Sequence, residues 1–401
     1  MYRLILPILF LCMNTVWAQN GHPEAFTIDQ VKRIVNDAAQ WQTENMPRAG
    51  RTVEYNPQFT GWADGVFMSA LADWAAYDNS RHFREWHEQI AYDLQWEVGH
   101  RSLNPANDIA VSLSYAAIWE RTGSPRYLIS KIEKWDAPTV KLLAGGWKSL
   151  IPTIERLDYQ MKSYPKTDNI NFEIAANQER WCWCDALYMA APTYACFANI
   201  TGNNEYREFM NREFWFTMEA LYDQEERLVF RDTRFFSMKE ANGAKVFWGR
   251  GNGWVVGALA RVMNFLPADY HSRERYENRF KQIMSRIIAL QDDRGYWHAS
   301  LLDPDSYPSP EMSATGFFTF GLWWGLNNGL LCEDEYLIPA KKAWAAMVGA
   351  VQPNGMLGYV QPIGDTPMNI SSSKNEVYGT ASFMLAGLEV VKYIDKHTTK
   401  K

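Results

Sequence analysis

Apolar residues recur along most of this chain with the spacing of a helix. From Leu187 onward they fall at positions 187, 190, 191, 194, 195 and 198, which is the pattern of one buried helix face. The alternation typical of strands is absent from the sequence over any useful length. The pattern therefore predicts an all-α fold, with similar helical stretches at residues 66–76, 109–119, 255–265, 317–326 and 381–393.

A weak internal repeat suggests how these helices are organised. Trp62-Ala-Asp-Gly-Val-Phe-Met-Ser-Ala resembles Trp183-Cys-Asp-Ala-Leu-Tyr-Met-Ala-Ala, and Asp64 and Asp185 are 185 − 64 = 121 residues apart. If that interval holds two helix pairs, each pair takes roughly 60 residues, and the chain holds about six pairs. Six helical hairpins could close into an (α/α)6 barrel or form an open solenoid, and the spacing alone leaves both possibilities open.

The first eighteen residues read as a secretory signal rather than as part of the fold. Arg3 precedes an apolar run over residues 4–13, and small residues at Val16 and Ala18 suit signal peptidase. We expect cleavage after Ala18, export to the periplasm or beyond, and a single domain over residues 19–401. Leu11 disfavours a lipid anchor on Cys12, and no other apolar stretch is long enough to predict a membrane span.

Charge and composition exclude several classes of partner. A net charge of −6 argues against nucleic acid as a ligand. The seven histidines form no cluster with metal-ligand spacing, so we expect no metal and no cofactor, and nothing indicates an obligate protein partner. We expect Cys182, Cys184, Cys196 and Cys332 to be free thiols. The 18 Trp, 20 Tyr and 20 Phe fit either a large core or a sugar-binding surface.

Two aspartates are candidates for acid–base chemistry. Asp185 follows Trp181 and Trp183 at a predicted helix start, where burial would raise its pKa and the helix dipole would lower it. Asp108, in the segment 104–110, is expected at the start of another inner helix. A second carboxylate would supply the pair that sugar hydrolysis usually uses. Plain helix capping explains each aspartate equally well on local evidence.

A third segment combines glycines with a cation and two indoles. It reads Phe247-Trp-Gly-Arg-Gly-Asn-Gly-Trp254 and lacks the Lys-Ser/Thr of a phosphate loop. We expect Arg250 to grip a carboxylated sugar, with Trp248, Asn252 and Trp254 lining the same site. The alternative is a tight turn in which Arg250 pairs with an internal acid. Downstream, Ser309 and Pro310 are expected to begin a helix.

Taken together, the segments 183–192, 248–254, 311–315 and 378–386 resemble the unsaturated rhamnogalacturonyl hydrolases of glycoside hydrolase family 105, relatives of family 88. The resemblance implies an (α/α)6 barrel and a hydrolase that removes a 4,5-unsaturated uronic acid from the non-reducing end of lyase-generated oligosaccharides. In that family an aspartate, here Asp185, protonates C4 of the enol ether and water adds at C5. The resemblance gives Asp108 the place of the second aspartate and Trp183 a place lining the site.

The sequence departs from the family pattern at one position. Many members carry a histidine where this chain has Arg231, within Val229-Phe-Arg-Asp-Thr-Arg-Phe235. We therefore expect Arg231 to contact substrate, but the resemblance does not imply which sugar follows the uronate. The remaining alternatives are another (α/α)6 enzyme, either an inverting glycosidase or a uronate lyase, and a non-catalytic glycan-binding protein.

Overall fold

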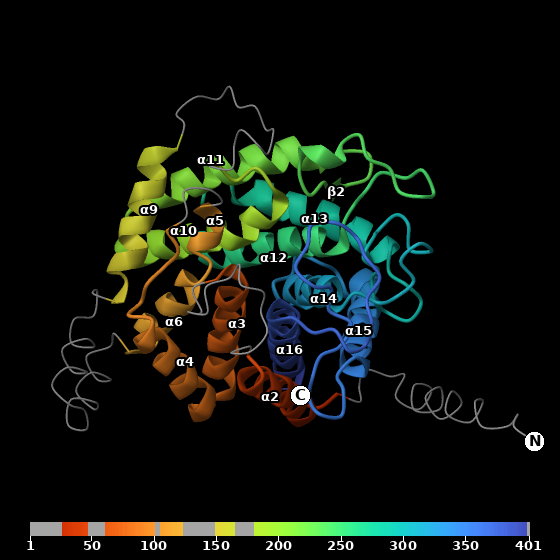
Figure 1. Ribbon diagram of the computed structural model, residues 1–401, viewed down its shortest axis with the longest axis horizontal. Coiled ribbons are helices and arrows are strands. Elements are labelled where there is room, and N and C mark those ends of the chain that lie inside the picture. Colours follow the sequence, from red (N-terminus) through yellow and green to blue (C-terminus); the bar gives the residue numbers. More distant parts are fainter. Residues whose placement is uncertain (1–25, 47–60, 101–104, 123–148, 165–179, 399–401) are drawn as a thin grey trace, which may run out of the picture.

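The computed structural model describes residues 26–46, 61–100, 105–122, 149–164 and 180–398, and the expected signal segment lies outside these ranges. The described residues are mainly helical, as the apolar spacing predicts (Figure 1). Six helices form an inner set: α3 (Trp62–Asp78), α6 (Ser112–Thr122), α10 (Cys184–Thr201), α12 (Gly249–Phe265), α14 (Met312–Asn327) and α16 (Val377–Thr398).

Six more helices pack around the inner set. They are α2 (Ile28–Glu44), α4 (Arg81–Asp93), α9 (Ile151–Ser163), α11 (Asn204–Leu221), α13 (Arg273–Ala289) and α15 (Glu333–Gly349). In Figure 1, α2, α4, α9, α11 and α15 lie around the periphery, while α3, α12, α14 and α16 lie toward the centre. A two-residue antiparallel pair, β1 (Tyr222–Asp223) with β2 (Leu228–Val229), follows α11.

The inner helices close into a ring. Each contacts the next in the order α3, α6, α10, α12, α14, α16, and α16 returns to contact α3. The first described helix, α2, packs on the last, α16, where Thr380 Oγ1 donates to Gln42 Oε1 at 2.6 Å. The fold is an (α/α)6 barrel. Closure excludes the open solenoid that the spacing had allowed.

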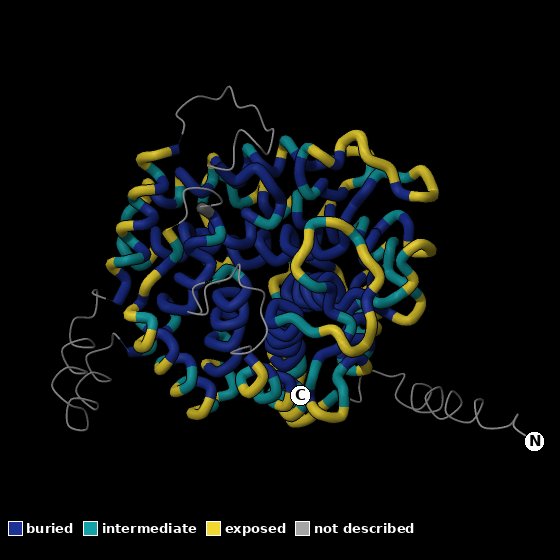
Figure 2. The backbone as a smooth tube through the Cα atoms, in the orientation of Figure 1, coloured by how far each residue is buried: buried dark blue, intermediate teal, exposed yellow. Residues whose placement is uncertain are grey.

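Burial separates the two sets of helices. Every residue from Met312 to Leu326 of α14 is buried, whereas α13 buries Tyr276, Phe280, Ile283, Met284 and Ile287 along one stripe. A helix that is apolar all round requires neighbours on every side, and an amphipathic helix covers a core from outside. Figure 2 shows the result, with buried segments at the centre and exposed ones at the rim.

Glycine lets the first inner helices approach closely. A Cβ on Gly65 of α3 would lie 2.5 Å from the backbone nitrogen of Val111, which is too short for any real contact. The Trp-x-Asp repeat begins α3 and α10. Between these two starts the described residues hold two hairpin units, α3 with α4 and α6 with α9, as the 121-residue spacing predicts.

Two local predictions need correction, and one alternative is excluded. Asp108 ends the short helix α5 (Pro105–Asp108) instead of beginning an inner helix, and α6 starts at Ser112. The tight turn that was the alternative for the glycine run is excluded, because α12 begins at Gly249 within it. Glu311, not Ser309, caps α14, because its carboxylate accepts the backbone N–H groups of Ser313 and Ala314.

The state of the cysteines agrees with the expectation of free thiols. The four cysteines are free, with three buried and Cys332 exposed. Within the part of the chain that the structure describes, no helix has the length and apolar content to cross a membrane.

Candidate functional site

The starts of the inner helices meet at one end of the barrel. Trp62 at the start of α3 stacks on Tyr378 at the start of α16, with ring centroids 5.4 Å apart. The guanidinium of Arg250 lies 4.9 Å from the centre of that tyrosine ring. A Cβ on Gly251 of α12 would lie 3.1 Å from Sγ of Cys184 in α10. These contacts gather α3, α10, α12 and α16 around a common mouth.

Asp185 lies in the first turn of α10 at this mouth. The helix N-cap is Trp183, which makes no side-chain capping bond, and Asp185 does not cap the helix either. Its side chain is 15% exposed, whereas the residues on both sides of it, Cys184 and Ala186, are fully buried. The thiol of Cys184 donates to Asp185 Oδ2 at 3.4 Å. The carboxylate therefore remains accessible in a surrounding that is otherwise closed.

Arg231 approaches the same carboxylate. Its Nε lies 3.6 Å from Asp185 Oδ2, and its Nη1 donates to Asp232 Oδ2 at 2.6 Å. Burial opposes the charge of Arg231, but Asp185 and Asp232 outweigh it and raise its pKa above the ordinary value. The backbone N–H of Cys184 donates to the carbonyl of Arg231 at 2.8 Å. The start of α10 and the segment after β2 are thus held together, with a permanent cation beside Asp185.

A chain of charges continues from Arg231 across the mouth. Arg234 donates to Asp232 Oδ2 at 2.9 Å and to Asp365 Oδ2 at 2.6 Å. Burial would raise the pKa of Asp232, but the bonds from Arg234 and Arg231 lower it below its ordinary value. Asp365 belongs to the largely exposed segment between α15 and α16. No local spacing predicts this pairing, because Arg234 and Asp365 are 131 residues apart.

Arg250 binds the segment between α15 and α16 through backbone carbonyls of that segment. Its Nη1 donates to the carbonyl of Gln361 at 2.7 Å, and its Nη2 donates to those of Pro362 and Gly364. The guanidinium also lies 4.3 Å from the centre of the Trp248 ring, and Arg250 is 1% exposed. Arg250 pairs with backbone carbonyls, not with the internal acid that was the alternative. Its grip on a substrate carboxylate stays a prediction.

Gln361 connects several of these elements and was missed in the sequence. Its N–H donates to Glu311 Oε1, its Oε1 accepts from Trp248 Nε1, and its carbonyl accepts from the hydroxyl of Tyr378 at 2.6 Å. It therefore ties together the starts of α12, α14 and α16. A lone glutamine in a loop has no spacing signal by which sequence reasoning could find it.

Asn252 has a structural part in this arrangement. Its Nδ2 donates to the carbonyls of Val229 and Trp248, and its Oδ1 accepts the N–H of Val229 at 2.8 Å. The residue is fully buried, so its amide fastens β2 to α12 and has no free hydrogen for a sugar. Contact of Asn252 with substrate stays a prediction, which these buried bonds disfavour.

Asp108 is buried and makes an ion pair. Its Oδ2 accepts from Nη2 of Arg156 in α9 at 2.7 Å, and the residue is 1% exposed. The helix that carries it, α5, contacts α10, the helix that carries Asp185. Its effect on the proton of Asp185 stays a prediction.

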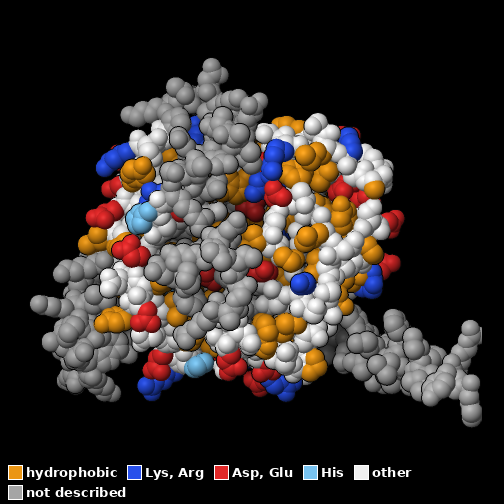
Figure 3. All heavy atoms as spheres, viewed as in Figure 1, with side chains coloured by type: hydrophobic (Ala, Val, Ile, Leu, Met, Phe, Trp, Pro, Cys, Tyr) orange, Lys and Arg blue, Asp and Glu red, His pale blue; other side chains and the backbone are white. Residues whose placement is uncertain are grey.

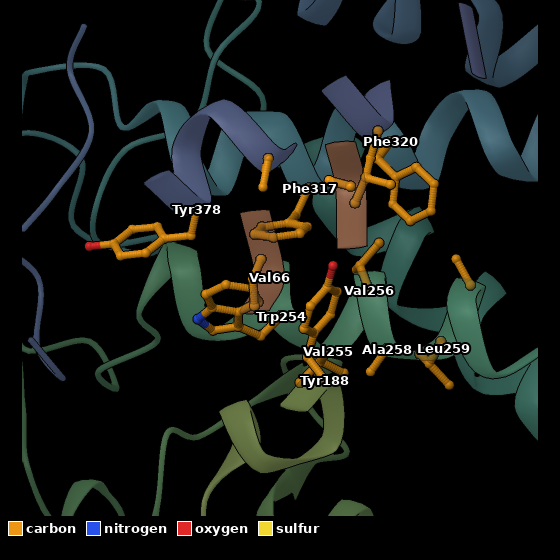
Figure 4. Packing of buried hydrophobic residues seen from close by; sticks show 14 of the residues in the cluster. Val66, Tyr188, Trp254, Val255, Val256, Ala258, Leu259, Phe317, Phe320 and Tyr378 are labelled. Atoms are coloured by element: carbon orange, nitrogen blue, oxygen red, sulfur yellow. The ribbon is translucent and has the colours of Figure 1, made fainter. Parts of the chain in front are cut away.

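Trp254 belongs to a cluster of aromatic side chains below the mouth of the barrel. In Figure 4 its indole packs with Tyr188 and Phe317, and the hydroxyl of Tyr378 points away from them. The ring centroids of Trp254 and Phe317 are 4.5 Å apart. Trp183, Trp248 and Trp254 are each at most 5% exposed, whereas Trp62, part of the sequence repeat, is partly exposed at the mouth. Trp62 is therefore a further candidate for contact with a sugar ring.

This arrangement suits proton transfer in an enclosed, charged setting. One accessible carboxylate, a fixed cation and a wall of aromatic rings lie together at the end of the barrel. Among the described residues, no group of three or more His, Cys, Asp or Glu side chains could hold a metal ion. On the face drawn in Figure 3, the visible Lys and Arg side chains are dispersed among Asp and Glu, without a continuous basic stripe.

Comparison with known proteins assigns the family. The sequence model for Glycosyl Hydrolase Family 88 matches residues 144–394. The chain is 36% identical over 405 residues to an unsaturated 3S-rhamnoglycuronyl hydrolase of Formosa agariphila, covering 96% of this chain and 98% of that protein. It is 33% identical over 391 residues to a hydrolase of the same name from an Alteromonas species, covering 94% and 90% respectively.

Solved structures share the fold over nearly the whole chain. A glycosyl hydrolase family 88 protein from Bacteroides vulgatus superposes with a TM-score of 0.73 at 27% identity, covering 92% of this chain and all of that one. A protein described as polysaccharide lyase BACCELL_00875 gives a TM-score of 0.72 at 28% identity, covering 92% and 98%.

Proposed function

The chain belongs to glycosyl hydrolase family 88, and we propose from this premise that it removes a 4,5-unsaturated uronic acid from the non-reducing end of lyase-generated oligosaccharides. Both curated relatives are named unsaturated 3S-rhamnoglycuronyl hydrolases and match nearly the full length of this chain. We therefore infer that a rhamnose-containing unit follows the uronate. The family and the relatives make the chain a glycosidase, and the observation that carries the reaction is the accessible carboxylate of Asp185 beside Arg231.

In the proposed reaction, Asp185 acts first as an acid. It protonates C4 of the enol ether, and water adds at C5 as the double bond is lost. Asp185 then takes up the proton that the water releases. The resulting hemiketal opens and the aglycone leaves. One proton-carrying group is enough, because the double bond already supplies the reactive carbon.

The charges around the mouth support an acidic substrate. Arg231 is partly exposed and its raised pKa keeps it protonated. Arg234, at 43% exposed, lies on the solvent side of Asp232. A charge-assisted hydrogen bond from an arginine to a carboxylate or sulfate is among the stronger polar contacts in proteins. We assign Arg231 to contact with the substrate and Asp108 to support of Asp185 from the wall.

The direct test uses a matched pair of substrates. Unsaturated rhamnoglycuronyl oligosaccharides from a lyase digest are compared with the same oligosaccharides after reduction of the double bond. We expect the chain to abolish the absorbance of the conjugated enol and release the shortened sugar from the first set only. If neither absorbance nor chain length changes across digests of several uronic polysaccharides, the proposal fails.

A second candidate function is a uronate lyase, because one structural neighbour is described as a polysaccharide lyase. A lyase would create unsaturated ends from an intact polymer, so the absorbance would rise instead of falling. An inverting glycosidase would release sugar from the reduced oligosaccharides. Binding without turnover would indicate a glycan-binding protein. Absorbance and product release together therefore distinguish the unsaturated uronyl hydrolase from a lyase, an inverting glycosidase and a glycan-binding protein.

We also infer that the chain is exported, on the sequence of residues 1–18. Mass spectrometry of the protein secreted by its host would find an N-terminus at Gln19. An uncleaved Met1 in the mature protein would contradict this.

A further inference from the structure

Two buried carboxylates lie together outside the ion pairs of the mouth. Glu240 belongs to the loop before α12, and Asp303 belongs to the loop between α13 and α14. The loops run side by side, because Leu301 N–H donates to the carbonyl of Phe247 and Trp248 bridges to Ser300. Glu240 is 9% exposed and Asp303 is 2% exposed.

Oxygen atoms converge at this point. Ser300 Oγ donates to Glu240 Oε1 at 2.6 Å, and the hydroxyl of Tyr307 lies 3.5 Å from Glu240 Oε2. The backbone N–H of Asp303 donates to Ser300 Oγ at 3.2 Å. In the described part of the chain, Asp303 Oδ2 is buried and has no hydrogen-bond partner. A buried oxygen of this kind calls for an ion or a water molecule that the chain itself does not supply.

Nothing in the described surroundings balances the two charges. No lysine, arginine or histidine of the described residues forms an ion pair with either carboxylate, and the groups that act on Glu240 are Ser300, Asp303 and Tyr307. Burial and the neighbouring Asp303 raise the pKa of Glu240, while the two hydroxyls oppose the rise. Buried charges in proteins are as a rule paired or bound to a metal ion.

We propose that Glu240 and Asp303, with the hydroxyl oxygens of Ser300 and Tyr307, form a site for one hard divalent cation of the calcium type. Carboxylate and hydroxyl oxygens are the ligands such ions prefer, and Ca²⁺ accepts irregular geometry with water in the remaining positions. Two carboxylates match the charge of one divalent ion. This departs from the expectation of no metal, which rested on histidine and cysteine spacing.

The site would fasten the loops beside the start of α12. Glu240 N–H donates to the carbonyl of Ala244, so the first loop folds back on itself next to the carboxylate. Gly249 N–H donates to the carbonyl of Ala299 at 2.7 Å, one residue before Ser300. A bound cation therefore joins the two loops that support Trp248 and Gly249, and its removal loosens them.

The test is the thermal midpoint of the full chain, first in a chelator and then with increasing CaCl2 or MgCl2. We expect Ca²⁺ at 100 times its Kd to raise the midpoint by about 3 °C, and calorimetric titration to give one site per chain. Glu240→Gln and Asp303→Asn should abolish this rise. In chelator both variants should be at least as stable as the unaltered chain, because one of two like charges has been removed. Asp293→Asn, an exposed aspartate nearby, is the matched control and keeps the full rise.

Two results would overturn the proposal: no response of the unaltered chain to either cation, or a response that Glu240→Gln and Asp303→Asn leave intact. If these variants do not fold, Tyr307→Phe removes a single ligand oxygen and should weaken Ca²⁺ binding severalfold. Unaltered affinity in Tyr307→Phe would then count against the site. None of these outcomes depends on the hydrolase activity, so the site and the proposed function are tested separately.

Discussion

The carboxylate of Asp185 lies between a charged and a neutral partner. Arg231 is held beside it by Asp232, and the Cys184 thiol donates to it from the adjacent residue. Burial and the nearby Asp185 raise the pKa of Cys184 well above its ordinary value, so the thiol stays protonated. The carboxylate therefore accepts a hydrogen bond from the Cys184 thiol and lies beside the cation of Arg231, and neither of these groups changes its protonation at neutral pH. It is the member of this group that can give and recover a proton.

Arg231 offers a prediction at the residue scale. In Arg231→Gln the cation beside Asp185 is lost, while Asp232 keeps its bond to Arg234. We expect KM for the unsaturated substrate to rise by roughly 10- to 100-fold, the value of one hydrogen bond to a charged group, with a smaller change in kcat. The KM of Arg231→Lys should lie between those of the unaltered chain and Arg231→Gln. Lys239→Gln, exposed in the same loop, serves as the control, and an Arg231→Gln enzyme with unaltered KM would remove Arg231 from the site.

At this scale the sequence located the candidates but not their partners. Asp185, Trp183 and Arg231 do lie together, because the N–H of Cys184 binds the carbonyl of Arg231. Asp365 and Gln361 could not be anticipated, since Asp365 meets Arg234 across 131 residues and Gln361 meets Trp248 across 113. The backbone bonds of Asn252 could not be predicted either, because a polar side chain in a glycine run has the same sequence pattern whether it faces a ligand or a buried backbone.

Among the elements, the glycine run of α12 shows why the sequence left a tight turn open as the alternative to a helix start. A Cβ on Gly249 would lie 2.5 Å from the carbonyl oxygen of His298. The glycines therefore admit neighbouring backbone to the first turns of a helix, which excludes the tight turn that the sequence left open as an alternative. Likewise, Pro310 looked like a first helical residue, but the N–H of Glu311 binds the carbonyl of Trp297 and keeps the chain extended until Met312.

The contact between α3 and α6 gives a prediction at the element scale. Gly65→Ala places a methyl group against the backbone of Ala110 and Val111, which cannot rotate away. We expect the free energy of unfolding to fall by about 1–3 kcal/mol, despite the gain of about 1 kcal/mol that alanine has over glycine in a helix. Urea denaturation of the Gly65→Ala variant and the unaltered chain measures this change in the free energy of unfolding. Gly364→Ala, with no atom nearer than 3.8 Å, is the control, and equal stability of both variants would contradict the close packing.

For the molecule as a whole, ring closure depends on contacts between the two ends of the described chain. The apolar spacing predicted the helices, and the family resemblance predicted the closed barrel. The apolar spacing alone could not predict closure. Closure depends on α16 packing on α2 and α3, and these helices are hundreds of residues apart in the sequence. The mouth exists only because the ring closes, since it joins the starts of α3, α10, α12 and α16.

Stability of the whole molecule should depend on His87 in α4. Burial and the nearby Arg121 lower the pKa of His87 to about 3, and in the described part of the chain neither ring nitrogen has a hydrogen-bond partner. The folded chain thus keeps His87 neutral while the unfolded chain protonates it below pH 6.5. This contribution to stability is complete above pH 6.5 and is lost progressively as the pH falls toward 3.

The magnitude follows from the same shift. Between pH 7 and pH 5 the penalty for His87 is about 2 kcal/mol, and His87→Leu should lose that much less stability over this interval than the unaltered chain. Denaturation curves at both pH values provide the comparison, with His271→Leu on the surface as the control. Equal losses in the His87→Leu and unaltered chains would show that His87 is protonated in the fold.

The central claim is that Asp185 supplies the proton that destroys the double bond. The measurement is the rate of absorbance loss from an unsaturated disaccharide with Asp185→Asn, compared with the unaltered chain and with Asp293→Asn. The amide keeps the shape of the side chain but cannot donate an acidic proton, so kcat should fall by at least about 100-fold while the thermal midpoint and the control are unaffected. Turnover within a few-fold of the unaltered chain would contradict the account.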